Sequence, residues 1–222
     1  VELFNAHGYV HHALHGQKAY HGVAILAKVA LPLEKVMRKD WCGIEQARHL
    51  YCTLPGGVEL HNFYVPAGGE KPDIEVNEKF KHKLDFMAAV TAWFKGRKRK
   101  NNRFVLVGDL NVAPLEADVW NHTQLLRVVS HTPIEVEHMA AWYASHDWVD
   151  AVRHFVPQDE KVFSWWSYRS PNWELADKGR RLDHVWVTPA LAGGLSGIEI
   201  LKSARGFDPA SDHAPVIVEL EI

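Results

Sequence analysis

The feature that most constrains the fold is an apolar run that ends in two polar side chains. Residues 105–114 read VLVGDLNVAP, so Asp109 and Asn111 follow a stretch typical of a buried strand. Because positions i and i+2 of a strand face the same way, both side chains can point into one site. A second polar cluster, SDHAP at residues 211–215, leads into the alternating strand VIVEL at 216–220. Two such clusters at strand ends predict one assembled active site.

The length and composition are sufficient for one large hydrophobic core. The chain has 222 residues and is 47% hydrophobic, which allows one or two domains, and we expect a single domain over residues 1–222. Its formal net charge of −2 provides no overall attraction to nucleic acid. Any phosphate binding must therefore come from a local basic patch. The charge balance neither favours nor excludes a DNA substrate.

The cysteine usage and the absence of targeting patterns predict a cytoplasmic protein, as in a bacterial cytosol. Cys42 and Cys52 lack the spacing of paired metal ligands and are interpreted as reduced thiols, with a disulfide between them as the less favoured alternative. No stretch approaches the ~18 apolar residues that a membrane span needs. The N-terminal residues show no signal-peptide pattern. We expect no membrane partner.

The periodicity of the sequence predicts alternating strands and helices. Apolar runs or alternating patterns predict strands, and one three- and four-residue repeat, from Phe80 to Phe94, indicates a helix. The expected strands are residues 23–27, 49–54, 58–65, a strand from 104, 182–187 and 216–220, and the expected helices are 77–94 and 136–146. Pro-Gly-Gly at 55–57 indicates a hairpin turn. This order is typical of a layered α/β sandwich.

Several segments together resemble the exonuclease III family over nearly the whole chain. They are HGQK (15–18), GVAIL (22–26), GDLNVAP (108–114), FSWWSYRS (163–170), RLD (181–183) and SDHAP (211–215). The last motif alone marks only the wider endonuclease/exonuclease/phosphatase superfamily. The resemblance implies a DNase I-like fold, which is a four-layered α/β sandwich with two packed β-sheets flanked by helices.

The resemblance also implies a metal-dependent DNA repair phosphodiesterase that acts on double-stranded DNA as a monomer. It would cleave 5′ to abasic sites and process 3′ ends as a 3′–5′ exodeoxyribonuclease. Such hydrolysis needs an activated water, stabilisation of charge and protonation of the leaving group. By resemblance, Asp109 lies beside the attacking water, as general base or as proton donor, and Asn111 orients the phosphate or water. His213 contacts the phosphoryl oxygen, Asp183 fixes the His213 tautomer, and the Tyr64 hydroxyl reaches the scissile phosphate.

The expected cofactor is Mg²⁺, with Mn²⁺ as a substitute, because the available ligands are hard oxygen donors. Asp212 matches a metal-ligand position, and Asp109 is a second candidate. The chain contains 15 histidines, but no His-x-x-x-His helix pair stands out among them. We therefore interpret them as surface or interface side chains rather than as a zinc site.

Four further residues are candidates for substrate binding. Trp165 and Leu182 match positions that wall the pocket for a flipped-out abasic sugar, with core packing as the alternative for Trp165. Arg169 and Arg181 are candidate phosphate contacts, each weighed against a surface salt bridge. The basic run at residues 95–100 precedes the strand whose far end carries Asp109, so we expect a solvated loop roughly 15 Å or more from the chemistry.

Three candidates in the catalytic set have structural alternatives. Asp109 could be a turn or cap residue after an apolar strand. Asp183 could pair with Arg181, two residues earlier on the same strand face. Tyr64 could be a core tyrosine with a satisfied hydroxyl.

The chain also departs from the family pattern. We expect it to be N-terminally incomplete, because no segment matches the strand that ends in an asparagine or the strand that ends in Gln-Glu. That glutamate is the family's principal metal ligand, and Glu2 does not match its position. Ala67 replaces a polar residue that often follows the Tyr-x-Pro element. Two alternatives therefore stay open, a catalytically impaired DNA-binding remnant and a phosphoesterase for small phosphorylated molecules or lipids.

Overall fold

The computed structural model describes residues 1–18, 21–30, 36–170 and 172–222. In chain order, its helices and strands are α1 (Glu2–Ala6), β1 (His11–Gly16), β2 (Gly22–Ala27), β3 (Met37–Arg38), β4 (His49–Thr53), β5 (Glu59–Tyr64), α2 (Glu78–Arg97), β6 (Phe104–Asp109), α3 (His122–Leu125), α4 (Pro133–Ala144), β7 (Val149–Asp150), α5 (Ala151–Phe155), β8 (Trp165–Trp166), α6 (Trp173–Ala176), β9 (Gly179–Arg180), β10 (Asp183–Val187), α7 (Pro189–Ala192), β11 (Leu195–Ile200) and β12 (Val216–Leu220).

The central sheet has six strands in the order β3-β4-β5-β6-β10-β7. Its pairs are antiparallel except for β5 and β6, which run parallel. The hairpin between β4 and β5 turns through residues 55–57, as the Pro-Gly-Gly sequence predicts. Three further antiparallel pairs, β1-β2, β8-β9 and β11-β12, form separate small sheets.

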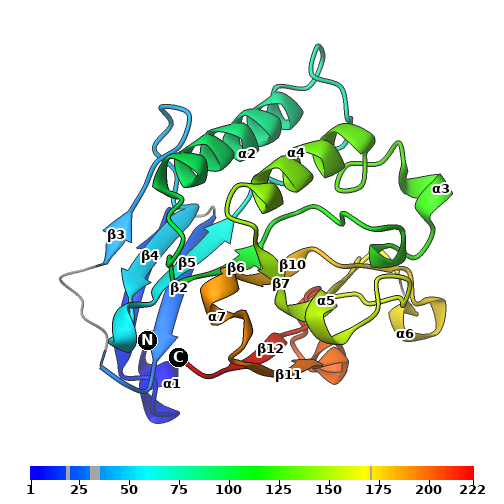
Figure 1. The fold of residues 1–222 in the computed structure, drawn as a ribbon. Helices are drawn as coiled ribbons and strands as arrows, with labels where there is room; N and C mark the ends of the chain where they lie inside the picture. The colour runs from blue at the N-terminus through cyan, green and yellow to red at the C-terminus, as the bar shows by residue number, and fades with distance from the viewer. Residues whose placement is uncertain (19–20, 31–35, 171) are drawn as a thin grey trace.

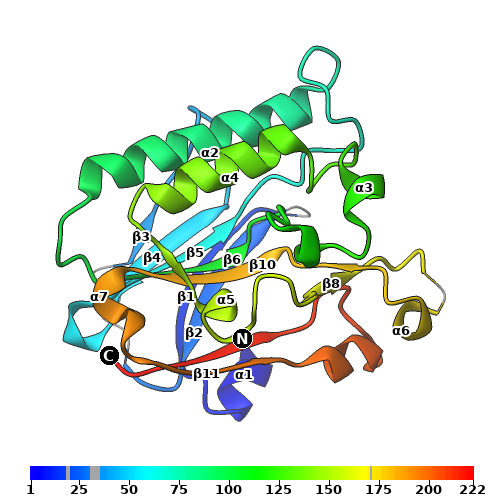
Figure 2. The ribbon, with the colours of Figure 1, turned by 45° about the vertical axis from the view of Figure 1, so that its right-hand side comes forward.

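The elements pack in layers around the central sheet. Figures 1 and 2 show α2 and α4 side by side over one face of the sheet, with β1, β2, β11 and β12 on the other face. Phe63 and Leu106 of the sheet pack against Met87 of α2 and Trp142 of α4 in the larger core. Val105 and Val185 face the opposite way, toward β11 and β12. The predicted mixed α/β class with packed sheets is confirmed.

Both predicted long helices are present, and their N-termini show why they begin where they do. The Asn77 side chain accepts hydrogen bonds from the backbone N–H groups of Lys79 and Phe80 at the start of α2. Helix α4 begins at Pro133, earlier than predicted, because Thr132 and Glu135 form a capping box around it. The periodic pattern locates the apolar face of α4, whereas the cap sets its first residue.

Strand β6 lies very close to β5 at its end, and only glycine permits this approach. Gly108 has φ of +133°, and a Cβ there would lie 2.0 Å from the Phe63 carbonyl oxygen. The next residue is Asp109. The backbone conformation that glycine allows at position 108 therefore sets the position of the Asp109 carboxylate. This part of the sheet is built around the predicted site.

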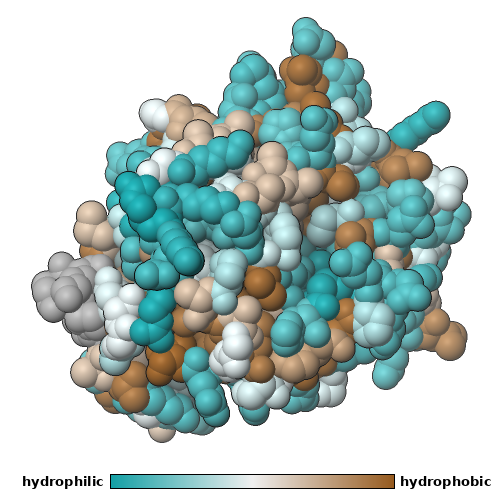
Figure 3. Space-filling model, in the orientation of Figure 1, coloured by the Kyte–Doolittle hydropathy of each residue, from teal (hydrophilic) through white to brown (hydrophobic). Residues whose placement is uncertain are grey.

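The surface carries scattered apolar side chains. Figure 3 shows apolar residues near the lower edge of this face, where α1 lies, and Leu3 and Phe4 of that helix are exposed. Both cysteines are free thiols, as predicted. Within the part of the chain that the structure describes, no helix is long and apolar enough to cross a membrane.

Candidate active site

Three of the predicted residues lie side by side on neighbouring strands. Asp109 at the end of β6 is the register partner of Tyr64 in β5 and of Asp183 in β10. Because β5 and β6 are parallel and β10 is antiparallel to them, two strand ends and one strand beginning meet at this edge of the sheet. The sheet register therefore assembles a tyrosine and two carboxylates in one row.

A tight turn after β6 binds Asn111 to Asp109. Asn111 adopts a left-handed conformation with φ of +54°, which asparagine tolerates better than most residues. Its backbone N–H and side-chain amide donate to the two Asp109 carboxylate oxygens, each at 2.9 Å. The same amide donates to the Val65 carbonyl at 2.9 Å. These bonds fix the orientation of the Asp109 carboxylate.

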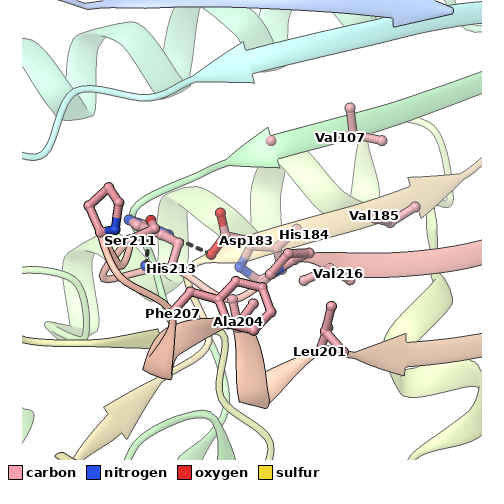
Figure 4. A pocket seen from close by; sticks show the side chains of 14 residues that line it. Val107, Asp183, His184, Val185, Leu201, Ala204, Phe207, Ser211, His213 and Val216 are labelled. Carbon is pink, nitrogen blue, oxygen red and sulfur yellow. Dashed lines mark hydrogen bonds and ion pairs between the residues drawn. The ribbon is translucent and has the colours of Figure 1, made fainter. Parts of the chain in front are cut away.

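His213 comes from the loop before β12 and completes the row. Its Nδ1 lies 2.7 Å from Asp183 Oδ2, and Figure 4 shows this contact at the rim of a cavity. Because a carboxylate accepts only, Nδ1 carries the proton and Nε2 faces Asp109 Oδ2 at 4.0 Å. Ser164 also donates to Asp183 Oδ2, at 2.7 Å, while its hydroxyl accepts from the backbone N–H groups of Leu182 and Asp183.

The charges of this row shift its protonation equilibria. Burial and the charge of Asp183 raise the pKa of Asp109 to about 7, although His213 and the N–H of Asn111 oppose the shift. For His213, burial acts to lower the pKa, but the hydrogen bond and charge of Asp183, with Asp109 and Asp212, raise it to about 9. Near neutral pH the site therefore holds an imidazolium beside a carboxylate that exchanges its proton readily.

Asp212 lies next to this row but is held by a different partner. Its Oδ2 accepts from the Trp165 indole N–H at 2.9 Å, and its backbone carbonyl accepts from the Trp166 N–H. Its charge acts on both His213 and Tyr64, so the carboxylate faces the same site. The isolated bridge between Trp165 and His213 attaches β8 to this loop.

A cavity of about 710 Å³ opens beside Asp183 and His213. Figure 4 shows its wall, in which Val107, Val185 and Val216 lie opposite Phe207. The apolar wall leaves the polar groups concentrated at one end, where Asp183, His213 and Ser211 lie. A substrate at this site would meet acid–base groups on one side and an apolar surface on the other.

The described residues include no group of three or more His, Cys, Asp or Glu side chains that could hold a metal ion. They provide one or two carboxylates, from Asp212 and Asp109. Mg²⁺ is commonly bound by one or two carboxylates together with water and substrate phosphate, so this donor set is compatible with that ion but is not a closed protein cage.

The four predicted substrate-binding residues have different surroundings. Arg181 does not fit a phosphate contact, because it is 1% exposed and bound to Asp118 and Asp150. Leu182 is also buried, in a small apolar cluster against which Trp165 packs, so it does not form an open pocket wall.

The surroundings of Trp165 and Arg169 are compatible with substrate binding, and these two roles stay predictions. Trp165 is half-buried, and the Arg180 guanidinium lies 5.3 Å from its ring centroid. Arg169 is exposed in the loop after β8. The basic run at 95–100 begins in the last turn of α2, and its Arg97 binds Glu59.

Sequence reasoning missed two supports of the site. Ser164, described above, lies within a recognised segment, but no spacing pattern marks its hydroxyl. The second support is the buried pair Lys83 and Glu135, whose side chains are 0% exposed. Lys83 Nζ donates to Glu135 Oε1 and to the Asn111 carbonyl at 2.8 Å. The available signals in the sequence are the capping-box spacing of Thr132 and Glu135 at the start of α4 and a lysine within α2.

The comparisons with known proteins agree with this geometry. The sequence model described as the Endonuclease/Exonuclease/phosphatase family matches residues 2–213. Exodeoxyribonuclease III of Haemophilus influenzae is 29% identical over 220 residues, covering 93% of this chain and 79% of that protein. A DNA-(apurinic or apyrimidinic site) endonuclease of Dictyostelium discoideum is 28% identical over 97% of this chain, which spans 57% of that protein.

A solved structure is also similar over the whole chain. It is the 3′ phosphatase NExo from Neisseria bound to a product DNA hairpin, with a TM-score of 0.87 and 26% identity. The match covers 100% of this chain and 82% of that one.

Proposed function

Because this chain belongs to the endonuclease/exonuclease/phosphatase family, we propose that it is a DNA repair hydrolase that processes 3′ ends of duplex DNA and cleaves 5′ to abasic sites. Relatives named exodeoxyribonuclease III and apurinic or apyrimidinic endonuclease support these two activities. The similarity to a 3′ phosphatase bound to DNA favours 3′ ends as the main substrate.

The observation that carries the proposal is the row formed by Asp109, His213 and Asp183. His213, charged through its contact with Asp183, would present a positive N–H to a phosphoryl oxygen that gains negative charge. Asp109 faces it at 4.0 Å, beyond hydrogen-bond distance, which leaves the carboxylate available to a water or leaving group. In this assignment Asp109 removes the proton of the attacking water, and a role as proton donor remains the alternative.

Two neighbours would orient the substrate. The Tyr64 phenol, whose pKa is raised by burial and by Asp109 and Asp212, stays protonated and can donate to the phosphate. Asn111 holds the Asp109 carboxylate with two of its donors and thereby sets the angle of proton transfer.

We propose Mg²⁺, with Mn²⁺ as a substitute, as the cofactor. Asp212 would hold the ion, with Asp109 as a second donor, and the ion would supply neutralisation of phosphoryl charge. The remaining ligands would be water and substrate oxygens.

The full-length protein can test the proposal with two labelled duplexes, one that carries a 3′-phosphate at a gap and one with a single abasic site. We expect product from both in Mg²⁺ and none in excess chelator. Asp109→Asn and His213→Gln should each lower the rate by at least about 100-fold. His154→Gln, at an exposed position in α5, is the matched control. Turnover that survives chelator or Asp109→Asn would contradict the proposal.

The same experiment separates the alternatives. A DNA-binding remnant would bind both duplexes with unchanged affinity after Asp109→Asn and release no product. A phosphoesterase for small molecules would hydrolyse phosphorylated metabolites or inositol lipids and leave both duplexes intact. If only the 3′-phosphate duplex were processed, the proposed 3′-end activity would stand and the proposed cleavage at abasic sites would be excluded.

A further inference from the structure

A second cavity, of about 520 Å³, opens beside Tyr64 and is not used by the proposed chemistry. It lies between the segment before β4, the end of β5, the loop after β5 and the first turns of α2. Its lining is His21, Gln46, Arg48, Tyr64, Pro66, Ala67, Gly68, Gly69, Lys79 and His82. The shared Tyr64 connects the cavity to the row that contains Asp109.

The lining is cationic in a chain whose net charge is −2. It contains one arginine, one lysine and two histidines, and none of the described residues that line it is acidic. The Lys79 side chain is exposed and makes no ion pair with any carboxylate of the described ranges. Gly68 and Gly69 have consecutive positive φ values of +90° and +73°, so this part of the wall is a turn that glycine adopts more readily than other residues.

The cationic side chains are held in place rather than spread over the surface. Arg48 donates to Gln46 Oε1 at 2.7 Å and to the Tyr64 carbonyl at 3.1 Å, and its guanidinium lies 5.1 Å from the Tyr64 ring centroid. Gln46 Oε1 also receives His82 Nε2 at 3.1 Å. Because that oxygen can only accept, His82 Nε2 carries the proton, and protonation of the ring adds its second donor at Nδ1.

We propose that this cavity binds a phosphate group of the DNA strand that lies in the active site. An anion fits the cationic lining, and the exposed Lys79 supplies a donor of the kind that positions DNA backbones. Tyr64 lines this cavity and is also the proposed donor to the scissile phosphate. The phosphate in the cavity would therefore be a nearby one on the same DNA strand. The inference rests on the proposed DNA substrate, but it assigns a separate subsite and new residues, Lys79 and His82.

His82 makes this binding depend on pH. Burial and the charge of Arg48 lower the pKa of both His21 and His82, with His15 and His82 also acting on His21, and only Asp85 opposing at His82. A phosphate in the cavity supplies negative charge that favours protonation of the His82 ring, whereas His21 Nδ1 accepts from Arg48 Nη2 at 3.3 Å and would lose that bond on protonation. Binding therefore takes up protons, and the affinity for DNA should increase as the pH falls below neutrality.

The test measures equilibrium binding of a labelled duplex in chelator, where turnover is blocked. In a set of duplexes, a neutral methylphosphonate replaces one phosphate at a time on either side of the scissile position. We expect one position to lower the affinity of the parent protein by about three- to tenfold. Lys79→Gln should lower the affinity for the unmodified duplex by a similar factor and reduce the salt slope by about one. In the Lys79→Gln variant, the methylphosphonate at that position should cause no further loss of affinity.

Lys95→Gln is the matched control, because it removes the same charge from the other end of α2. His82→Gln should reduce the increase in affinity between pH 7.5 and 5.5. The subsite would be overturned if the losses of affinity from the methylphosphonate and from Lys79→Gln were additive. It would also be overturned if Lys79→Gln and Lys95→Gln lowered the affinity equally. Because the parent protein is assayed for cleavage of the same duplexes in Mg²⁺, failure of the subsite is distinguishable from failure of the proposed function.

Discussion

Asp109 and Asp183 are direct cross-strand partners in β6 and β10, so the sheet holds two carboxylates opposite each other. Like charges in such a pair destabilise the sheet unless neighbouring groups compensate. Here the His213 imidazolium compensates, because it binds Asp183 at 2.7 Å and lies 4.0 Å from Asp109. The pair is therefore costly for folding but raises the proton affinity of both Asp109 and His213, which is useful for acid–base chemistry.

This arrangement predicts a bell-shaped dependence of kcat/KM on pH. Activity should rise as Asp109 loses its proton near pH 7 and fall as His213 loses its proton near pH 9. Replacement of Asp183 by Asn removes a negative neighbour from both groups, so both limbs should move to lower pH. Steady-state rates on the 3′-phosphate duplex from pH 5 to 10 measure both. Activity that falls through pH 7 would instead assign Asp109 as the proton donor.

The buried pair Lys83 and Glu135 should behave as a coupled unit beneath Asn111. Burial lowers the pKa of Lys83, whereas Glu135 opposes that shift, so the ammonium depends on its partner. We expect Lys83→Met alone to lower the free energy of unfolding by about 3 to 5 kcal/mol, because it leaves a buried carboxylate without its cation.

The double-mutant cycle with Glu135→Gln tests this coupling. The free energy of unfolding lost in the double variant should be smaller than the sum of the two single losses by about 1 kcal/mol or more, as measured by urea unfolding. Strictly additive losses would contradict a direct interaction. We also expect a lower kcat in the Lys83 variant, since its Nζ supports the Asn111 carbonyl.

Arg181 and Arg169 should separate fold stability from DNA contact. Arg181→Met leaves Asp118 and Asp150 without their shared cation, so we expect a loss of about 3 to 5 kcal/mol in stability and an unchanged salt slope of DNA binding. Arg169 is exposed, so Arg169→Gln should leave stability unchanged and reduce the salt slope by about one. If Arg181→Met reduced the salt slope while stability stayed constant, its structural assignment would be wrong.

Much of the fold was predictable because strand and helix periods are local properties of the sequence. The apolar run before Asp109 predicts β6, and the Phe80 to Phe94 pattern predicts α2. Neither pattern contains information about strand register, which sets Tyr64 and Asp183 on either side of Asp109. The family resemblance, rather than the spacing, brought these three residues together.

The errors concern residues whose partners are far away in the chain. Arg181 lies two residues before Asp183 in the sequence, and the alternative interpretation of Asp183 is an ion pair between them. Its actual partners are Asp118 and Asp150, while Asp183 binds His213. A charged residue near a motif can be part of the site or of the buried network beneath it, and only tertiary contacts distinguish the two.

His184 should make the protein less stable in mild acid. It is fully buried, with Nδ1 accepting from Arg181, so Nε2 carries the proton and donates to the Val112 carbonyl at 2.8 Å. Burial and the charge of Arg181 lower its pKa to about 4 from 6.5. A folded pKa below the unfolded value means that this stability is complete above pH 6.5 and is lost as the pH falls toward 4.

The shift corresponds to a loss of about 3 kcal/mol from His184 over that range. His184→Gln retains a side-chain N–H but cannot be protonated, so its unfolding free energy should fall less steeply between pH 6.5 and 4 than that of the parent. His154→Gln, at an exposed position, controls for the removal of an imidazole. Since Asp109 and His213 titrate in both proteins, the difference between the two urea-unfolding curves isolates His184. Parallel curves for the parent and His184→Gln would refute this assignment.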